Sequence, residues 1–322
     1  MKIQNITVIG CGRWGSFIAK HLCELGFEVT LYGRKSSPHM RAFLENGKND
    51  LMTLPKKIRL TCSLKEALEG HDVLVISIGS QGLRALCGEL RSLGLDRGLA
   101  VLCMKGLELG TGKRLTTVVR EELGDGVKSA VWLGPGHVQA FCAGIPNCMV
   151  IDSDDENIKR ALVDAFSSTL IRFYYGQDLI GNEIGAAAKN VIGIAAGLLD
   201  GIALSPLKGA LMSRGTREIA RLIKAIGGNE LSAYGLCHLG DYEATVFSPY
   251  SHNRCFGEAF AKGEQFPDLA EGYYTVRALN TLGEQTGSEL PICRTIEDVL
   301  YHNRPMKEAL FSLFERSIKN EF

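Results

Sequence analysis

Residues 6–15 read ITVIGCGRWG, an apolar strand-like run that ends in three glycines at G-x-G-x-x-G spacing and passes into a helix-like segment. In such a stretch Gly10 permits a tight turn, Gly12 lets the backbone approach a pyrophosphate, and Gly15 lets helix and strand pack closely. The helix N-terminus adds free N–H groups and the positive end of its dipole. A second strand-like run follows at 28–32, so the stretch predicts a dinucleotide-binding turn rather than an unrelated glycine turn.

Short β-branched runs alternate with amphipathic stretches through the first half of the chain. The expected strands are 5–10, 28–33, 58–61, 72–78, 99–104, 129–133, 147–151 and 170–175. The expected helices between them are 14–26, 37–45, 64–69, 81–92, 112–123 and 156–167. This alternation predicts right-handed βαβ units and a mostly parallel sheet with helices on both faces.

The pattern changes near residue 178, and helical segments follow one another from Asn182 onward. They are expected at 182–203, 206–227, 231–236, 254–262, 268–286, 291–301 and near 305–318. The chain is therefore predicted to be an α/β protein, with a Rossmann-like dinucleotide-binding domain over 1–180 and an all-helical substrate and catalytic domain over 181–322. Cofactor and substrate are expected to meet in a cleft between the domains, outside the carboxyl ends of the strands.

Composition excludes several classes of function. Among 322 residues, 36 Lys and Arg balance 36 Asp and Glu, so no net charge favours nucleic acid or an anionic membrane. The apolar stretch 190–212 contains Asp200, Pro206 and Lys208, which predicts buried helices rather than a membrane span. The first residues already form the expected strand, leaving no signal peptide, and a cytoplasmic location is expected.

The ten cysteines are scattered, without a C-x-x-C pair or a zinc-ligand spacing with the seven histidines. Many lie in apolar runs, among them Cys23, Cys103 and Cys142. We therefore expect reduced, buried thiols and no metal site.

The loop after the second expected strand bears on the choice of cofactor. NAD-binding folds usually place Asp or Glu there, to bind the ribose 2′-OH. Here Tyr32 and Gly33 are followed by Arg34 and Lys35. A guanidinium suits a 2′-phosphate, so NADP is favoured over NAD, with a solvated surface loop as the alternative.

Two lysines stand in positions suited to chemistry. Lys105 follows the apolar run 99–104, where open α/β sheets hold ligands. Lys189 stands on a segment of Gly, Ala and branched aliphatics. Desolvation there would lower its pKa and make it a better proton donor or acceptor near neutrality. The alternatives are a surface loop for Lys105, and for Lys189 a side chain that reaches the solvent or pairs with Glu183.

A third polar concentration runs from Gly240 to Gly257 and contains Ser251, His252, Asn253 and Arg254 in succession. Hydroxyl, amide, guanidinium and backbone N–H donors there could form an anion cradle. The alternative is a helix N-cap at Ser251 or Asn253.

Together these motifs resemble the NAD(P)-dependent glycerol-3-phosphate dehydrogenases of the bacterial type, over nearly the whole chain. The motifs are, in order, Gly10–Gly15, Ser80-Gln81, Lys105–Glu108, Gly134-Pro135, Glu183–Val191, Gly240-Asp241 with Thr245, Ser251–Gly257 and Glu271-Gly272. The Lys-Asn-Val helix followed by Gly-Asp and then Ser-x-Asn-Arg is the most specific part.

The resemblance implies reversible hydride transfer between NAD(P)H and dihydroxyacetone phosphate, a phosphorylated triose, giving sn-glycerol 3-phosphate for glycerophospholipid metabolism. It implies that Lys189 is the catalytic proton donor and acceptor. It also implies a set of substrate-binding residues: Lys105, Lys189, Asp241, Ser251, His252, Asn253 and Arg254. The implied cofactor-binding residues are Gly10, Gly12, Arg13, Trp14, Gly15, Arg34, Lys105, Gly134, Val138, His252, Leu269 and Glu271. A homodimer is expected, because symmetric dimers are the commonest soluble assemblies.

Two departures from the family pattern bear on the substrate. His252 stands where the family usually has Arg, which loses a bidentate phosphate contact that Arg254 could replace. The run Gly134-Pro135-Gly136-His137-Val138-Gln139-Ala140 lacks the hydroxyl residue and the following acid that the family usually has near the nicotinamide. Two alternatives stay open: a related reductase of another 2-oxo or 3-hydroxy compound, and a non-catalytic NAD(P)-binding sensor.

Overall fold

The computed structural model describes residues 2–315, 317 and 320. The chain divides into two compact units. The first runs through Lys105 and resumes over Arg114–Glu183, and the second holds Gly106–Lys113 and the chain from Ile184 onward. The short excursion Gly106–Lys113 therefore packs with the helical unit, although it follows a strand of the first unit, and the sequence pattern did not indicate it.

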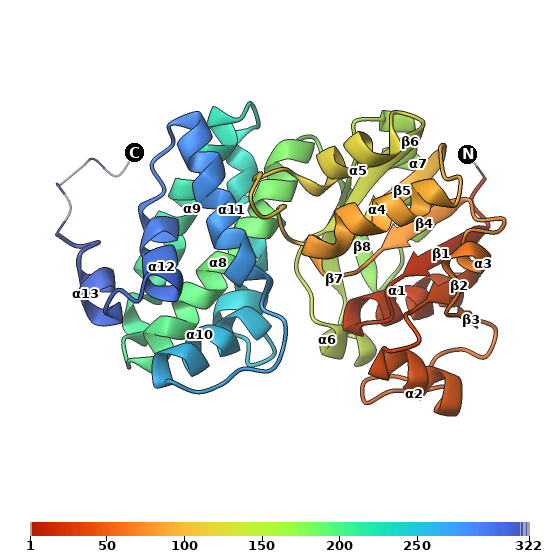
Figure 1. Ribbon diagram of the computed structural model, residues 1–322, viewed down its shortest axis with the longest axis horizontal. Helices are drawn as coiled ribbons and strands as arrows, with labels where there is room; N and C mark the ends of the chain where they lie inside the picture. The colour runs from red at the N-terminus through yellow and green to blue at the C-terminus, as the bar shows by residue number, and fades with distance from the viewer. Residues whose placement is uncertain (1, 316, 318–319, 321–322) are drawn as a thin grey trace. The chain divides into compact units, whose positions relative to one another are not determined.

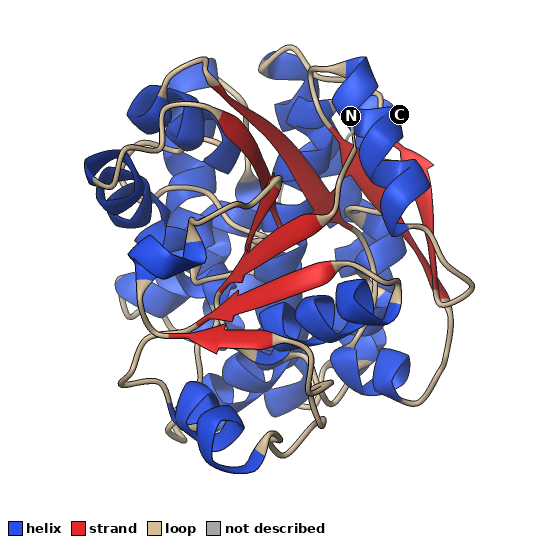
Figure 2. Ribbon diagram, turned by 90° about the vertical axis from the view of Figure 1, so that its right-hand side faces the viewer, coloured by secondary structure: helices blue, strands red, loops and turns tan. Residues whose placement is uncertain are grey.

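An eight-stranded sheet forms the first unit, in the order β3-β2-β1-β4-β5-β6-β7-β8 (Figure 2, red). The strands are β1 (Asn5–Ile9), β2 (Glu28–Tyr32), β3 (Arg59–Thr61), β4 (Val73–Ile76), β5 (Gly98–Leu102), β6 (Val127–Leu133), β7 (Asn147–Asp152) and β8 (Ile171–Tyr175). All neighbouring pairs are parallel except β6 and β7. The predicted mostly parallel sheet is confirmed. All four residues of β4 are buried, as expected of a central strand covered on both faces.

Helices connect these strands: α1 (Arg13–Glu24), α2 (Pro38–Asn46), α3 (Leu64–Ala67), η1 (Ser80–Gly82), α4 (Leu83–Ser92), α5 (Leu115–Leu123), α6 (Val138–Cys142) and α7 (Glu156–Phe166). The sequence pattern missed α6, because five residues are too few to show a helical period. The expectation for Cys142 was wrong: this thiol is exposed. It ends the short α6, whose buried contacts come from Val138 and Phe141 instead.

Helices make up the second unit, and its described residues contain no strand. They are α8 (Leu179–Gly201), which begins in the first unit, η2 (Ser205–Leu207), α9 (Lys208–Ala225), η3 (Glu230–Tyr234), η4 (Leu239–Asp241), η5 (Glu243–Phe247), α10 (His252–Lys262), α11 (Glu271–Thr286), α12 (Pro291–Tyr301) and α13 (Met306–Phe311). The all-helical prediction is confirmed. The segment expected at 231–236 is a 3-10 turn, and α13 ends before the expected 318, with residues 316 and 318 outside the described part.

Helix α8 lies among α9–α12 of its unit (Figure 1, green) and approaches its neighbours through glycines. A Cβ on Gly193 would lie 2.7 Å from Thr245 Cγ2, and one on Gly197 would lie 2.0 Å from the Arg254 carbonyl oxygen. By length and composition α8 could cross a membrane, but 89% of its apolar window is buried within the fold. Close packing in the helical unit accounts for its apolar sequence.

Candidate functional site

The glycine turn at the end of β1 is held by close backbone contacts. Gly10 has φ +114°, and its N–H donates to the Tyr32 carbonyl oxygen at 2.9 Å. A Cβ on Gly10 would lie 2.1 Å from the Ser77 carbonyl oxygen, and one on Gly15 would lie 1.9 Å from the Gly10 carbonyl oxygen. The fold itself therefore requires glycine at positions 10 and 15.

Gly12 differs, because a Cβ there would meet nothing within 4 Å. It is the N-cap residue of α1, and no side chain caps that helix. The first N–H groups of α1 thus begin beside open space, where a helix N-terminus favours an anion. This geometry fits a dinucleotide pyrophosphate.

Arg34 and Lys35 follow β2 and are both exposed. Gly33, just before them, is buried, and a Cβ there would lie 2.4 Å from Cys11 Sγ. The chain therefore packs tightly against the glycine turn at residue 33 and then presents two cations to solvent. Their positive charge fits a 2′-phosphate.

Two predicted cofactor residues meet at the end of β5. Lys105 Nζ donates a hydrogen bond to the Gly134 carbonyl oxygen at 2.6 Å. Gly134 itself has φ +122°, and a Cβ there would lie 3.0 Å from Met149 Cα. The loop after β6 is thus fixed by its glycines, and it fixes the Lys105 ammonium in turn.

The backbone conformation and packing at Gly136 explain why glycine stands where the family usually has a hydroxyl residue. It has φ +144°, and a Cβ there would lie 2.4 Å from a ring carbon of Phe141. Phe141 stacks on Phe17, with ring centroids 5.0 Å apart, and Trp14 lies 6.0 Å from the Phe141 ring. Val138 is 6% exposed and belongs to the same core, so its side chain supports the loop.

Lys189 is the centre of a buried polar cluster in the second unit. It is 8% exposed, and its Nζ donates to Thr245 Oγ1 at 2.7 Å and lies 3.1 Å from Asp241 Oδ2. The Thr245 hydroxyl donates in turn to the Asp241 carbonyl oxygen at 2.7 Å. Lys189 and Asp241 are separated by 52 positions in the numbering, yet the fold brings them together as the family resemblance implied.

The alternative partner of Lys189, Glu183, is committed elsewhere. Its carboxylate accepts from Arg114 Nη1 at 2.7 Å and from the Thr116 hydroxyl and N–H at 2.6 and 3.0 Å. Burial raises the pKa of Glu183, and these donors oppose that shift. Lys189 therefore faces Asp241 and Thr245, and it does not pair with Glu183.

Thr245 and Asn190 make polar contacts in this region, and the sequence pattern indicated no role for either residue. Thr245 lies on η5, a π-helical turn, and is fully buried. Asn190 follows Lys189 in the chain, and its Oδ1 accepts from Asn253 Nδ2 at 3.0 Å. The spacing of four residues between Asp241 and Thr245 was the available signal, since it places both on one face of a helical turn.

The polar run at the start of α10 has two functions in the structure. Ser251 caps α10, its Oγ accepting from the Arg254 N–H at 3.3 Å, so the helix-cap alternative is correct for this residue. Asn253 Oδ1 accepts from the Gly272 N–H at 2.9 Å, while its amide nitrogen bonds Asn190 as above. Asn253 therefore joins α8, α10 and α11.

Arg254 and His252 flank Asn253 and have different partners. Arg254 Nε donates to Asp200 Oδ2 at 2.7 Å, and its Nη2 lies 3.2 Å from Glu258 Oε2. His252 Nδ1 lies 3.3 Å from the Leu269 carbonyl oxygen, and its Nε2 lies 3.8 Å from Asp268 Oδ2. Arg254 thus pairs with two carboxylates, which Lys208 and Lys262 share. His252 is placed beside Leu269, which is 52% exposed and lies two residues before Glu271, the first residue of α11.

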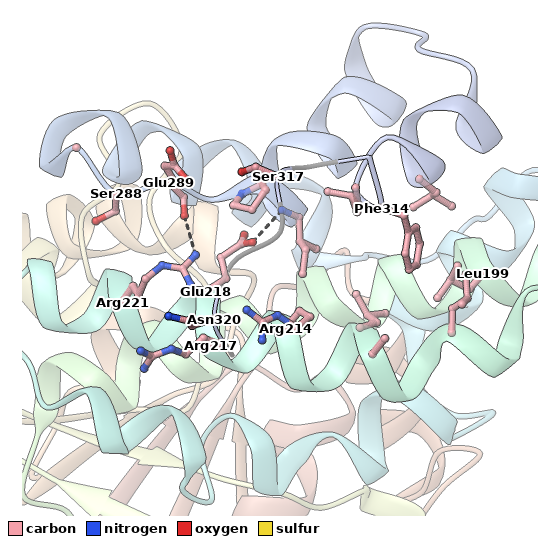
Figure 3. A pocket seen from close by; sticks show the side chains of 18 residues that line it. Leu199, Arg214, Arg217, Glu218, Arg221, Ser288, Glu289, Phe314, Ser317 and Asn320 are labelled. Atoms are coloured by element: carbon pink, nitrogen blue, oxygen red, sulfur yellow. Dashed lines mark hydrogen bonds between the residues drawn. The ribbon is translucent and has the colours of Figure 1, made fainter. Parts of the chain in front are cut away.

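The second unit also contains a cavity of about 870 Å³ over α9 (Figure 3). Arg214, Arg217 and Arg221 line it together with apolar residues of α13 and of the segment that follows it, Leu310, Leu313 and Phe314. Glu218 on the same wall accepts from the Ile292 and Cys293 N–H groups, at 2.8 and 3.0 Å, at the start of α12. No residue lining this cavity belongs to the predicted site. The described residues contain no group of three His, Cys, Asp or Glu able to hold a metal ion.

Two family models match the chain, one for each part of this geometry. The N-terminal model of NAD-dependent glycerol-3-phosphate dehydrogenase matches residues 5–159, and its C-terminal model matches residues 178–311. A relative from Prosthecochloris aestuarii, named glycerol-3-phosphate dehydrogenase with NAD(P)+ as cofactor, is 33% identical and covers 98% of this chain and 99% of its own. The chain belongs to the glycerol-3-phosphate dehydrogenase family.

Other members of this family are similar over the whole chain. A Moorella thermoacetica relative of the same name is 36% identical and covers 99% of this chain and 98% of its own. The crystal structure of glycerol-3-phosphate dehydrogenase from Coxiella burnetii has a TM-score of 0.92 at 28% identity, covering 98% of this chain and 99% of that one. A 2-dehydropantoate 2-reductase structure from Methylococcus capsulatus has a TM-score of 0.62 at 17% identity, which shows a shared fold alone.

Proposed function

We propose that this chain catalyses reversible hydride transfer between NAD(P)H and dihydroxyacetone phosphate, giving sn-glycerol 3-phosphate. Lys189 is the proton donor in reduction and the proton acceptor in oxidation. The observation that carries the proposal is the buried lysine itself, held 2.7 Å from Thr245 Oγ1 and 3.1 Å from Asp241 Oδ2. A buried amine with two fixed acceptors is oriented before any substrate binds.

The hydrogen-bond directions define what Lys189 can do. The single Thr245 proton goes to the Asp241 carbonyl oxygen, so the hydroxyl presents a lone pair to the Lys189 ammonium. Asp241 Oδ2 adds a negative charge that stabilises the ammonium form. Lys189 can therefore hold a proton in this buried cluster and transfer it to an oxygen that gains negative charge.

The cofactor supplies the remaining chemistry. When bound, the reduced nicotinamide provides the hydride for the substrate carbonyl carbon. The residues proposed to hold this cofactor are Gly10, Gly12, Gly15, Arg13, Trp14, Arg34, Lys105, Gly134, Val138, His252, Leu269 and Glu271. The open space at Gly12 and the exposed pair Arg34 and Lys35 support pyrophosphate binding and a preference for NADP.

The substrate is proposed to contact Lys105, Lys189, Asp241, Ser251, His252, Asn253 and Arg254. Among the last four, Asn253 has the most defined orientation, since both ends of its amide are hydrogen-bonded. His252 provides an imidazole ring at the position where the family usually has Arg. Because two carboxylates flank the Arg254 guanidinium, its contribution to phosphate binding is proposed to be weaker than that of His252.

The test is an assay of cofactor oxidation with dihydroxyacetone phosphate, run separately with NADPH and NADH, beside a panel of 2-oxo acids. We expect turnover with the phosphate ester and a higher kcat/KM with NADPH. Turnover with a 2-oxo acid, and none with dihydroxyacetone phosphate, would establish the related-reductase alternative. Cofactor binding without turnover of any substrate would establish the sensor.

We also propose that the enzyme is a cytoplasmic homodimer whose product enters glycerophospholipid synthesis. The balanced charge and the predominance of symmetric dimers among soluble oligomers support this. Light scattering of the purified protein, at concentrations above and below that in the assay, measures the assembly. A monomer at every concentration would contradict it.

A further inference from the structure

His238 is a fully buried histidine next to the Lys189 cluster that the mechanism does not use. It is 0% exposed, and both of its ring nitrogens have partners. Nδ1 lies 2.8 Å from the Gly185 carbonyl oxygen, and Nε2 lies 2.8 Å from the Tyr242 hydroxyl. Because a carbonyl only accepts, Nδ1 carries the proton, and Nε2 accepts from Tyr242.

The protonation states of this pair are fixed by burial. Burial lowers the pKa of His238 to about 4, outweighing the neighbouring Asp241 charge, which raises it, while Lys189 lowers it further. Burial also raises the pKa of Tyr242. Near neutral pH the imidazole is uncharged and the phenol keeps its proton, so neither group exchanges protons with a substrate.

Both hydrogen-bond partners of His238 lie close in the chain to residues of the Lys189 cluster. Gly185 precedes Lys189 by four residues on α8, so its carbonyl belongs to the helical turn that presents Lys189. Tyr242 follows Asp241 directly, and its own carbonyl accepts from the Thr245 N–H at 3.1 Å. The imidazole therefore links the turn that carries Lys189 to the turn that carries Asp241 and Thr245.

Close packing supports the same bridge. A Cβ on Gly185 would lie 3.0 Å from His238 Cβ, so glycine there lets the two turns approach. On the far side, Thr216 Oγ1 of α9 lies 3.3 Å from the Tyr242 oxygen, and Thr216 is 2% exposed. His238 and Tyr242 flank η4, and together with Thr216 of α9 these buried side chains form one connected network.

We propose that His238 and Tyr242 are positioning residues, which hold Asp241 and Thr245 at the correct distance from Lys189. This role rests on the proposed function of Lys189. His238 is the N-cap residue of η4, so losing its bond to Gly185 lets the Asp241 turn move relative to α8, and losing its bond to Tyr242 frees the imidazole that makes this contact. Catalysis then falls because small displacements of an oriented proton donor are costly.

The experiment compares Tyr242→Phe with a matched control in the same unit, Tyr301→Phe. Tyr301→Phe also removes one hydroxyl hydrogen bond, which Tyr301 donates to the Tyr273 carbonyl oxygen at 2.6 Å. We expect Tyr242→Phe to lower kcat for dihydroxyacetone phosphate roughly 10-fold and to leave the KM for NADPH unchanged. Tyr301→Phe should leave both constants unchanged, whatever stability either variant loses.

Two further variants separate positioning from folding. His238→Asn keeps an amide donor near the Nδ1 position, whereas His238→Leu removes both bonds. We expect the asparagine variant to retain more of kcat than the leucine variant. Equal kcat values in His238→Asn, His238→Leu and the wild type, measured on the folded fraction, would overturn the proposal.

A second readout does not depend on turnover. The acetylation rate of Lys189 in the protein without substrate, measured by peptide mass spectrometry, reports the contact between its amine and Asp241. We expect faster acetylation in Tyr242→Phe than in Tyr301→Phe, because a loosened carboxylate stabilises the ammonium less. Equal rates would contradict positioning. If the acetylation rates of the two variants differ as expected but the wild type does not turn over dihydroxyacetone phosphate, only the proposed function is contradicted.

Discussion

The glycine turn of the first unit and the Lys189 cluster of the second are built in opposite ways. The turn is one short backbone segment, which contacts the backbone of Tyr32 and Ser77, and its close contacts exist because side chains are absent at Gly10 and Gly15. The cluster is made of side chains from segments far apart in the chain, joined by hydrogen bonds. A backbone site is specified locally, while a side-chain site depends on the packing of a whole unit.

Lys189→Ala is the change with the largest expected effect. It removes the proposed proton donor and should lower kcat by roughly 10³-fold while leaving NADPH affinity unchanged. Steady-state kinetics and a binding titration with NADPH measure the two effects. The matched control is Lys208→Ala, which removes another buried lysine of the same unit, bonded to Asp200 at 2.6 Å. Lys208→Ala should cost stability but not kcat, and equal kcat in Lys189→Ala and wild type would show that Lys189 is not the proton donor.

Gly12→Val tests the other side of the comparison. Gly12 has φ −68° and open space at its Cβ, so valine should fit the fold but fill the place of the pyrophosphate. NADPH affinity should fall roughly 100-fold, or about 3 kcal/mol, with the melting temperature retained. Gly10→Ala should instead unfold the first unit, because its Cβ would overlap the Ser77 carbonyl group. If Gly12→Val binds NADPH normally, the turn does not hold the cofactor.

These two regions also differ in how much of them the sequence predicted. The turn, all eight strands and the helical second unit follow from local spacing and periodicity. The partnership of Lys189 with Asp241 came from family resemblance, since no local pattern measures a distance across 52 positions. The roles of Thr245 and His238 went unrecognised because they lie in or near short 3-10 and π-helical turns, which leave no periodic signal.

Acid should affect the side-chain cluster through His238. Its pKa is about 4 in the fold against an ordinary 6.5, so between these values the unfolded chain binds more protons. The free energy of unfolding should therefore fall as pH falls from about 6.5 toward about 4, by about 2 kcal/mol at pH ~5. Urea titrations of wild type and His238→Asn isolate this contribution from Glu183 and Glu218, whose raised pKa values act in the opposite direction. An identical pH dependence in both proteins would refute it.

Arg34→Ala should have the smallest effect and should concern the first unit alone. Removing one exposed guanidinium is expected to reduce the preference for NADPH over NADH roughly 5-fold, or about 1 kcal/mol. The ratio of kcat/KM for the two cofactors measures it. Arg41→Ala, which removes an exposed arginine from α2, is the control and should not change that ratio. An unchanged ratio in Arg34→Ala would mean that this loop is a solvated surface loop that does not select the cofactor.

The glycines of α8 have a consequence for how this enzyme can evolve. A Cβ on Gly197 would overlap the Arg254 carbonyl group, and one on Gly193 would overlap Thr245. Most substitutions at these positions should therefore prevent folding, so selection on activity does not act on them. Residues 248–252 are not among the nearest neighbours of a Cβ on either glycine, so we expect the packing of α8 to tolerate substitutions there better. A laboratory selection for a new substrate should accordingly leave α8 unchanged and collect its mutations around His252.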